Sequence, residues 1–144
     1  MKTRISVITL GVSDLERSRT FYKNLFDLSP SSLSNEHITF FSVGGLVVGL
    51  FGLEDLAKDA CLKTIKQSTD FGGITLAYVV KNKEEVSQIL DHAATLGALI
   101  LKPAQDVFWG GHSGYFSDLD GHVWEVAFNP FFTLDAIGNI ALPQ

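Results

Sequence analysis

Cysteine, proline and concentrated positive charge are all scarce in this chain of 144 residues. Cys61 is the single cysteine, so no disulfide can form within the chain, and we expect a reducing, cytoplasmic location. The net charge of −5 comes with no basic tract, which argues against nucleic acid as a partner. No apolar run approaches the roughly 18 to 20 residues that span a bilayer, so we expect no membrane association.

The composition is that of a folded domain. Apolar residues make up 46% of the chain and charged residues 19%, which excludes a disordered protein. A chain of this length buries roughly two-thirds of the surface that its unfolded form exposes, enough for a core of its own. The remaining candidate partners are small molecules and other proteins.

The first half begins with signals for a strand followed by a helix. Residues 5–12 are rich in β-branched and apolar side chains and predict the strand. Ser13 and Glu16 then form the pattern of a capping box, in which each side chain accepts a hydrogen bond from a free amide of the first helical turn. One face of the predicted helix is apolar: Leu15, Tyr22, Leu25 and Phe26.

The second half repeats this arrangement. Residues 74–80 predict a strand, Asn82 and Glu85 form a second cap, and a helix ends near Gly97. The apolar residues of this predicted helix recur at helical spacing and form one stripe: Val86, Ile89, Leu90, Ala93 and Leu96.

Extended segments follow each helix, so that each half has the order β-α-β-β-β. We expect them at residues 28–34, 37–43, 46–52, 98–102, 113–117 and 122–128. The predicted fold class is α+β, a single domain over residues 1–144 made of two modules. The modules would form one curved mixed sheet with the helices outside and a concave cleft inside. Their expected limits are about 1–52 and 73–130, joined by a linker 53–72 with a helix over 53–66, and followed by a tail without clear periodicity.

A carboxylate interrupts the last predicted hairpin. The segment GYFSDLDGHVWEVAFNP, residues 114–130, has a turn at Asp118-Leu119-Asp120-Gly121 between two short strands, which places Glu125 in mid-strand. Because side chains alternate between the faces of a strand, Trp124 and Val126 turn towards the helix and Glu125 turns towards the opposite, concave face.

These features resemble the vicinal oxygen chelate superfamily, which includes glyoxalase I, extradiol dioxygenases, fosfomycin-resistance transferases and bleomycin-binding proteins. The resemblance rests on the paired modules, on ITLGVSDLERSRTFY near the N-terminus and on DLDGHVWEV near the C-terminus. It covers nearly the whole chain, and it implies the glyoxalase-like fold without fixing a reaction.

In metal-using members, symmetry-related strand positions each supply one ligand, usually His, Gln or Glu. The resemblance places the last of these on Glu125, and others on Val7 and on either Thr75 or Ile74. Superposing Gly45 on Gly121 aligns the two sequence halves and puts Gly49 opposite Glu125. A metal site needs several converging donors, and these positions supply one carboxylate, so we expect no metal cofactor of the superfamily type. The histidines lie on other elements or on the opposite strand face: His37, His92, His112 and His122.

Glu125 has two interpretations. It is either a structural carboxylate that accepts hydrogen bonds from its neighbours, or a ligand-binding or catalytic group that moves a proton. Tyr115 shares its predicted face, and the resemblance implies substrate contact there. The other candidate ligand-binding residues are Thr75, Trp109 and Ser113.

Two classes of function stay open. The first is a glyoxalase/bleomycin-resistance-like protein that binds a small organic molecule in the concave cleft without the usual metal. The second is an enzyme of the same superfamily, a lyase or dioxygenase acting on a small molecule with a divalent metal or with Glu125 as general base. The resemblance also implies a homodimer.

Overall fold

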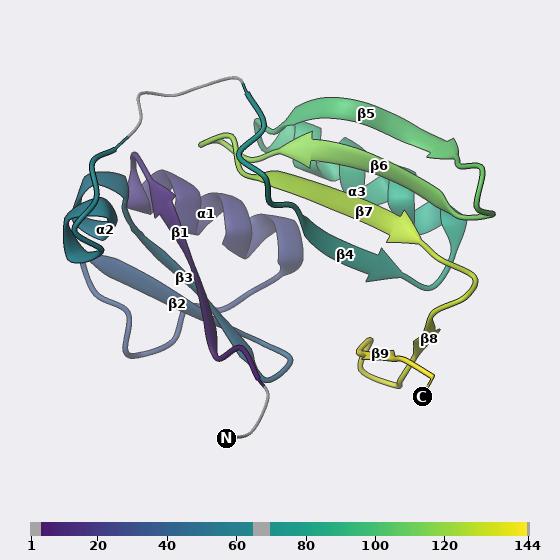
Figure 1. The fold of residues 1–144 in the computed structure, drawn as a ribbon, viewed down its shortest axis with the longest axis horizontal. Helices are drawn as coiled ribbons and strands as arrows, with labels where there is room; N and C mark the ends of the chain where they lie inside the picture. Colours follow the sequence, from purple (N-terminus) through teal and green to yellow (C-terminus); the bar gives the residue numbers. More distant parts are fainter. Residues whose placement is uncertain (1–3, 65–69, 144) are drawn as a thin grey trace. The chain divides into compact units, whose positions relative to one another are not determined.

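The chain forms two compact units, each with its own mixed β-sheet. The computed structural model describes residues 4–64 and 70–143, and the two units are Met1–Ser68 and Thr69–Gln144 (Figure 1). Helices packed on mixed sheets confirm the predicted α+β class. In the described parts of the chain, no helix is long and apolar enough to cross a membrane. That the units make a single domain with one curved sheet stays a prediction.

Unit 1 contains a three-stranded sheet in which β3 is central. β3 pairs parallel with β1 and antiparallel with β2, giving the order β1-β3-β2. The elements are β1 (Val7–Val12), α1 (Leu15–Phe26), β2 (Ile38–Val43), β3 (Leu46–Gly52) and α2 (Leu53–Asp59).

The predicted fourth strand of the first half is wrong. Residues 28–34 form turns, and their one described bridge joins Pro30 to Phe41 of β2. Pro30 has no amide hydrogen to donate, and the described backbone pairing with β2 consists of this bridge and the hydrogen bond from the Ser31 amide to the Phe40 carbonyl at 2.8 Å. The first half therefore has the order β-α-β-β.

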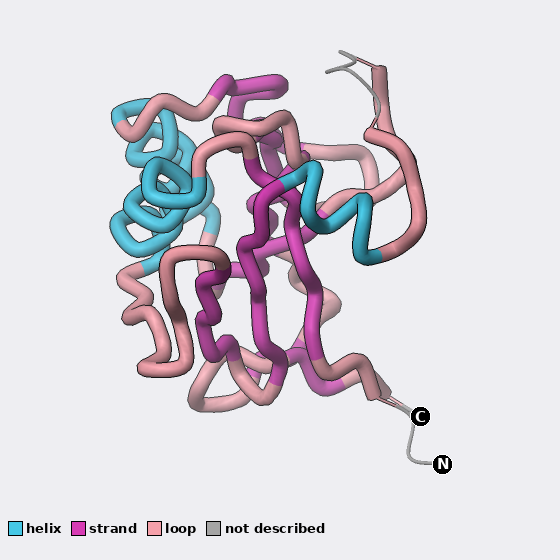
Figure 2. The backbone as a smooth tube through the Cα atoms, turned by 90° about the vertical axis from the view of Figure 1, so that its left-hand side faces the viewer, coloured by secondary structure: helices cyan, strands magenta, loops and turns pink. Residues whose placement is uncertain are grey.

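The core of unit 1 lies between α1 and one face of this sheet. Phe21, Tyr22 and Leu25 of α1 are buried, as are the alternating positions Phe41 and Leu50 of the strands. Tyr22 and Leu25 of the predicted apolar face are thus buried, whereas Leu15 and Phe26 are only partly buried. Figure 2 shows α1 on one side of the strands and the shorter α2 on the other.

The connecting helix is shorter than expected. It ends at Asp59, and Cys61 adopts a left-handed backbone with a φ of 56°. An isolated left-handed residue breaks the helical hydrogen-bond series, so the helix cannot run on to residue 66. Residues 65–69, which include part of the predicted linker, lie outside the described chain.

Unit 2 has the predicted order β-α-β-β-β. Its strands are arranged β4-β7-β6-β5, with β4 and β7 parallel and the other pairs antiparallel. The elements are β4 (Leu76–Val80), α3 (Lys83–Thr95), β5 (Leu99–Asp106), β6 (His112–Ser117) and β7 (Val123–Phe128). β5 extends beyond the predicted 98–102, because register shifts let it pass Pro103 without a regular ladder.

Helix α3 packs closely on one face of this sheet. Val86, Leu90 and Ala93 are buried, as the predicted stripe requires. A Cβ atom at Gly114 of β6 would lie 2.4 Å from Cδ1 of Leu90. Glycine at this position therefore allows the helix to approach the strand, and it identifies the face of β6 that α3 covers.

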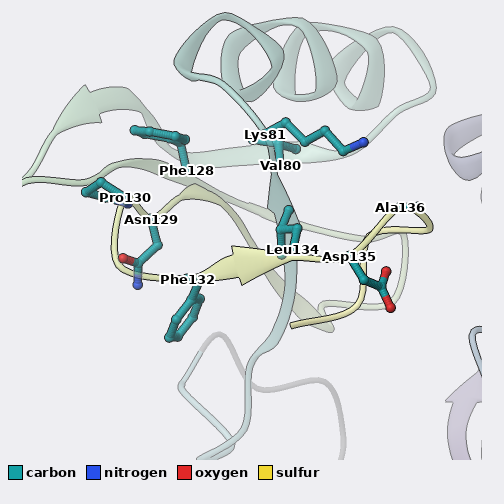
Figure 3. A pocket seen from close by; sticks show the side chains of 9 residues that line it. All are labelled: Val80, Lys81, Phe128, Asn129, Pro130, Phe132, Leu134, Asp135 and Ala136. Carbon is teal, nitrogen blue, oxygen red and sulfur yellow. The ribbon is translucent and has the colours of Figure 1, made fainter. Parts of the chain in front are cut away.

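The tail contains a hairpin that the sequence did not indicate. β8 (Thr133–Leu134) pairs with β9 (Ile140–Ala141), and the tail folds back towards the ends of β4 and β7 (Figure 3). Asp135 stabilises the turn, because its Oδ1 accepts hydrogen bonds from the amides of Ile137 and Asn139 at 3.0 and 2.9 Å. Strands of two residues are too short to produce a visible alternation in sequence.

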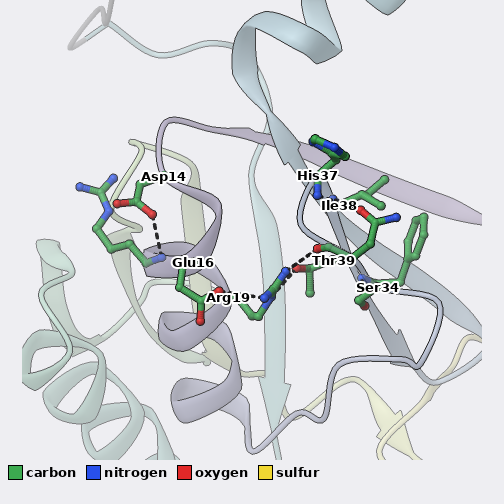
Figure 4. A network of polar contacts seen from close by, with 10 residues as sticks. Asp14, Glu16, Arg19, Ser34, His37, Ile38 and Thr39 are labelled. Atoms are coloured by element: carbon green, nitrogen blue, oxygen red, sulfur yellow. Dashed lines mark hydrogen bonds and ion pairs between the residues drawn. The ribbon is translucent and has the colours of Figure 1, made fainter.

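The two principal helices use equivalent caps, one of which differs from the prediction. Asn82 accepts a hydrogen bond from the amide of Glu85 at 3.1 Å, as expected. In α1 the cap is Asp14, which accepts from the amide of Arg17 at 3.0 Å, rather than Ser13 (Figure 4). Either residue type can cap a helix, and the start one residue later leaves the Ser13 hydroxyl to accept from the Arg17 guanidinium.

A polar network then fixes α1 to β2. The Nε of Arg19 donates to Oγ1 of the fully buried Thr39 at 2.7 Å, and its Nη1 pairs with Glu16 at 2.8 Å (Figure 4). Glu16 is thus used by a side chain and not by the predicted capping box. The network satisfies a buried hydroxyl, so we assign it a structural role.

Candidate functional site

The turn between β6 and β7 sets the geometry of the candidate site. The buried Asp118 accepts hydrogen bonds through Oδ1 from the amides of Asp120 and His122, at 2.9 and 2.8 Å. Gly121 closes the turn with a φ of 88°, a conformation that favours glycine. This tight connection holds the two strands in one register, in which Tyr115 lies directly opposite Glu125.

Glu125 lies on the face of the sheet that α3 leaves uncovered. Its neighbours Trp124 and Val126 are buried, and Val126 pairs with Gly114, which faces α3. Successive side chains alternate between faces, so Glu125 and Tyr115 both project from the other side. The predicted parity of this hairpin is therefore confirmed.

Tyr115 and Glu125 are neighbours across the β6–β7 pair, and their side chains interact electrostatically. Burial raises the pKa of the Tyr115 hydroxyl above its ordinary value of 10.0, and the Glu125 charge and the hydrogen bond to Glu125 raise it further. Tyr115 therefore stays protonated at neutral pH and remains a hydrogen-bond donor beside the carboxylate. The partly exposed pair combines a fixed donor with a carboxylate that retains free acceptor positions.

Two of the other candidate residues lie near this pair along the strands. Ser113 is two positions from Tyr115 on the same face, is only 3% exposed, and pairs with Ala127. Thr75 is exposed and precedes β4, two positions before Ala77, which pairs with Glu125. The strand register thus places Ser113 beside the pair and leaves Thr75 at the margin of the same sheet.

Trp109 occupies the loop between β5 and β6, away from the Tyr115–Glu125 row. Its ring covers Gly111, where an added Cβ would lie 2.0 Å from the indole carbons. The amide of Gly110 bonds to the carbonyl of Val107 at 3.0 Å and closes the loop beneath it. Trp109 therefore packs against the backbone of its own loop at Gly111. Its contact with a ligand stays a prediction.

The residues around Glu125 in unit 2 do not fit a divalent metal ion. Its partners across the sheet are Ala77, which has no donor atom, and Tyr115, whose raised pKa keeps its hydroxyl protonated. A metal site needs several deprotonated or neutral donors that converge. Within residues 4–64 and 70–143, no group of three or more His, Cys, Asp or Glu side chains is placed to hold an ion.

Sequence motifs do not reveal two groups of polar residues near this sheet. Lys102 pairs with Tyr115 on the other side of β6, but the register shifts in β5 hide this pairing from any count of residues. Asp106 lies between Lys83 and His112, with its Oδ1 at 3.0 Å from Nζ and 2.9 Å from Nδ1. Lys83, His112 and Asp106 come from three elements, so only the fold brings them together.

Comparison with known proteins defines the class to which this architecture belongs. The family model of the Glyoxalase/Bleomycin resistance protein/Dioxygenase superfamily matches residues 4–126. The chain is therefore a member of this superfamily, and the resemblance inferred from the terminal motif is confirmed.

Individual relatives agree with this assignment. A metallothiol transferase FosB from Lysinibacillus sphaericus is 31% identical over 121 residues, which cover 84% of this chain and 79% of the relative. A glyoxalase-related enzyme from Fulvimarina pelagi superposes with a TM-score of 0.88 at 32% identity, covering 99% of this chain and all of that one. The fosfomycin resistance protein FosX from Listeria monocytogenes superposes with a TM-score of 0.66 at 27% identity, covering 90% and 95%.

Proposed function

We infer that this protein binds a small organic molecule on the face of the β4-β7-β6-β5 sheet that carries Glu125. The observation that carries this proposal is the cross-strand pair of Tyr115 and Glu125, which projects from the sheet face opposite α3. A charged strand residue held by one tyrosine, beside small side chains such as Ala77 and Ala127, is typical of an apolar binding site with few oriented polar groups.

The chemistry of the pair favours a ligand that donates hydrogen bonds. An ionised carboxylate only accepts hydrogen bonds, so Glu125 offers acceptor positions to a bound ligand, and its charge adds to the rise in the Tyr115 pKa. A neutral molecule with N–H or O–H groups, or an organic cation, can satisfy them. An anion would meet the Glu125 charge and needs a counter-charge from elsewhere.

Native mass spectrometry of freshly purified protein tests this proposal, and it requires no assumption about which ligand is bound. We expect a retained small molecule, or one selected from a library of organic amines and alcohols, that Glu125→Gln binds at least about tenfold more weakly. Thr133→Val, in the tail hairpin, serves as a matched control with unchanged affinity. Equal retention by wild type and Glu125→Gln would reject the proposal.

The second candidate function is transfer of a thiol group. Its support is the 31% identity to a protein named as a metallothiol transferase, together with the 27% identity to a fosfomycin resistance protein. Incubation with fosfomycin, cysteine or glutathione, and Mn²⁺ or Mg²⁺ tests it directly. A fosfomycin–thiol adduct detected by mass spectrometry, absent without protein, would favour this function over metal-free binding.

A homodimer accompanies either function. Most soluble oligomers are symmetric homodimers, and the superfamily resemblance favours one here. Light scattering at micromolar concentration should give twice the mass of 15.7 kDa. A monomer mass under these conditions would contradict the proposal.

A further inference from the structure

A pocket lies in unit 2, apart from the sheet face that carries Glu125. It has a volume of about 560 Å³ and is formed where the tail hairpin meets the ends of β4 and β7 (Figure 3). This volume lies within the range of small-molecule sites. Val80 and Phe128, a register pair at the strand ends, form part of its wall. Phe128 shares strand parity with Val126, so it projects from the face opposite to Glu125.

The pocket has an apolar body and a charged end. Phe132 and Leu134 of the tail complete the apolar wall begun by Val80 and Phe128. Lys81 and Asp135 lie at one end of the pocket, and Phe128 and Phe132 lie towards the other (Figure 3).

Lys81 is available to a ligand. Within residues 4–64 and 70–143, its ammonium group makes no ion pair or hydrogen bond, although Asp135 lines the same pocket. A lysine that borders an apolar wall packs its stem there and presents its charge at the rim. It therefore offers three donors to an incoming carboxylate.

Asp135 supplies the opposite charge and keeps a free acceptor position. Hydrogen bonds from the backbone of Asn139, and then from its side chain and neighbouring amides, hold the pKa of the Asp135 carboxyl below its usual value. The group is therefore ionised at neutral pH. Oδ1 accepts from two amides, and Oδ2 accepts from the Asn139 side chain at 3.1 Å, which leaves one position on Oδ2.

We propose that this pocket binds a small zwitterion with an apolar body, of the amino-acid type, independently of the Glu125 face. The ligand's carboxylate bonds to Lys81, its ammonium group bonds to Asp135, and its apolar group lies against Phe128 and Phe132. A ligand with one charge is disfavoured, because a lone carboxylate meets the charge of Asp135 and a lone ammonium meets that of Lys81.

Three related probes test this charge pattern on the wild-type protein. L-Phenylalanine carries both charges, whereas 3-phenylpropionate and 2-phenylethylamine each carry one on the same apolar body. In a two-dimensional NMR titration we expect L-phenylalanine to shift the amides of Val80, Lys81 and Leu134, and to bind at least about tenfold more tightly than either analogue. Lys81→Met should weaken L-phenylalanine binding by a similar factor, whereas Lys58→Met on α2 should leave it unchanged.

Three results would overturn the proposal. They are no shift of the pocket amides at millimolar L-phenylalanine, equal binding of a single-charge analogue, and unchanged affinity in Lys81→Met. Shifts at Tyr115 and Glu125 in place of the pocket amides would likewise reject it, since they would assign the ligand to the other site. The wild-type comparison of the three probes stands even where a variant fails to fold.

Discussion

The two units use the same strand pairing and differ in the chemistry at its centre. In unit 1 the central strand β3 pairs Gly49 with Thr9 and Phe40. In unit 2 the central strand β7 pairs Glu125 with Ala77 and Tyr115. Each central residue lies four positions after a glycine with positive φ, Gly45 at 89° and Gly121 at 88°. Gly49 is therefore the counterpart of Glu125, as the superposition of the two sequence halves predicts.

The two central positions differ in exposure, and only the one in unit 2 carries a polar side chain. Gly49 is buried, and a Cβ there would lie 3.3 Å from Oγ1 of Thr9 and 3.7 Å from Cδ1 of Phe40. Glu125 is partly exposed and held by Tyr115. The three paired residues at the centre of the unit 1 sheet therefore carry no charge, whereas the equivalent three in unit 2 include the Glu125 carboxylate.

The largest expected effect tests whether the two units fold as one. Phe41→Ala removes a fully buried ring from unit 1 and should lower the free energy of unfolding by about 3 to 5 kcal/mol. If the chain is a single cooperative domain, hydrogen exchange should accelerate in both units. Phe116→Ala, the matched change in unit 2, should give the same pattern. Accelerated exchange in the mutated unit alone would mean two domains.

A pair of glycine substitutions compares the packing of the two sheets. In Gly114→Ala the new Cβ meets Cδ1 of Leu90 at 2.4 Å and the backbone oxygen of Lys102 at 2.7 Å, so the free energy of unfolding should fall by about 1 to 3 kcal/mol or more. Gly49→Ala meets no atom closer than 3.3 Å and should cost less than about 1 kcal/mol. Urea denaturation of the two variants measures the difference, and the reverse order would contradict the packing described here.

The pH dependence of the surface cluster gives a smaller effect. Lys83 and His112 hold the pKa of Asp106 below its ordinary value of 3.8. A carboxyl with a lowered folded pKa adds stability above its unfolded pKa and loses it as the pH falls through the folded pKa. Asp106→Asn should therefore lower the melting temperature slightly at neutral pH, and the difference should shrink as the pH falls below 3.8 and vanish below the lowered pKa of the folded state. A difference that is constant through the acid range would show that no charge is involved.

The smallest change concerns Tyr115 itself. Glu125→Gln removes the charge that helps to raise the pKa of Tyr115, while burial remains. That pKa should move down towards 10.0 without a change of fold. An ultraviolet titration measures it, with Tyr115→Phe identifying which transition belongs to this residue. An unchanged transition would mean that the two side chains do not interact in solution.

The sequence predicted unit 2 more accurately than unit 1, for a physical reason. Strand alternation and the Asp118–Gly121 turn were enough to place Glu125 and Tyr115 on one face, because a short turn fixes the register of a hairpin. The strand predicted at residues 28–34 was wrong, because this polar segment, which contains Pro30, forms a single bridge to β2 and no continuous ladder. The local sequence does not distinguish a segment that forms a strand ladder from one that forms a single bridge, because the pairing depends on the neighbouring strand.

Features made by distant segments were beyond sequence reasoning. The pocket that contains Lys81 and Asp135 depends on the fold-back of a tail whose strands are two residues long. The pairing of Lys102 with Tyr115 depends on bulges in β5. Neither a motif nor a hydrophobic period marks such features, which arise from tertiary packing.

The central claim is that Glu125 is a ligand-binding carboxylate, and calorimetry on Glu125→Gln tests it most directly. Glutamine keeps the size and the hydrogen-bonding reach of Glu125, so the free energy of unfolding should stay within about 1 kcal/mol of wild type. Affinity for the organic ligand retained by the wild-type protein should fall by about tenfold or more, as a charge-assisted hydrogen bond is lost. A lower melting temperature together with unchanged ligand affinity would contradict the account and make Glu125 a structural residue.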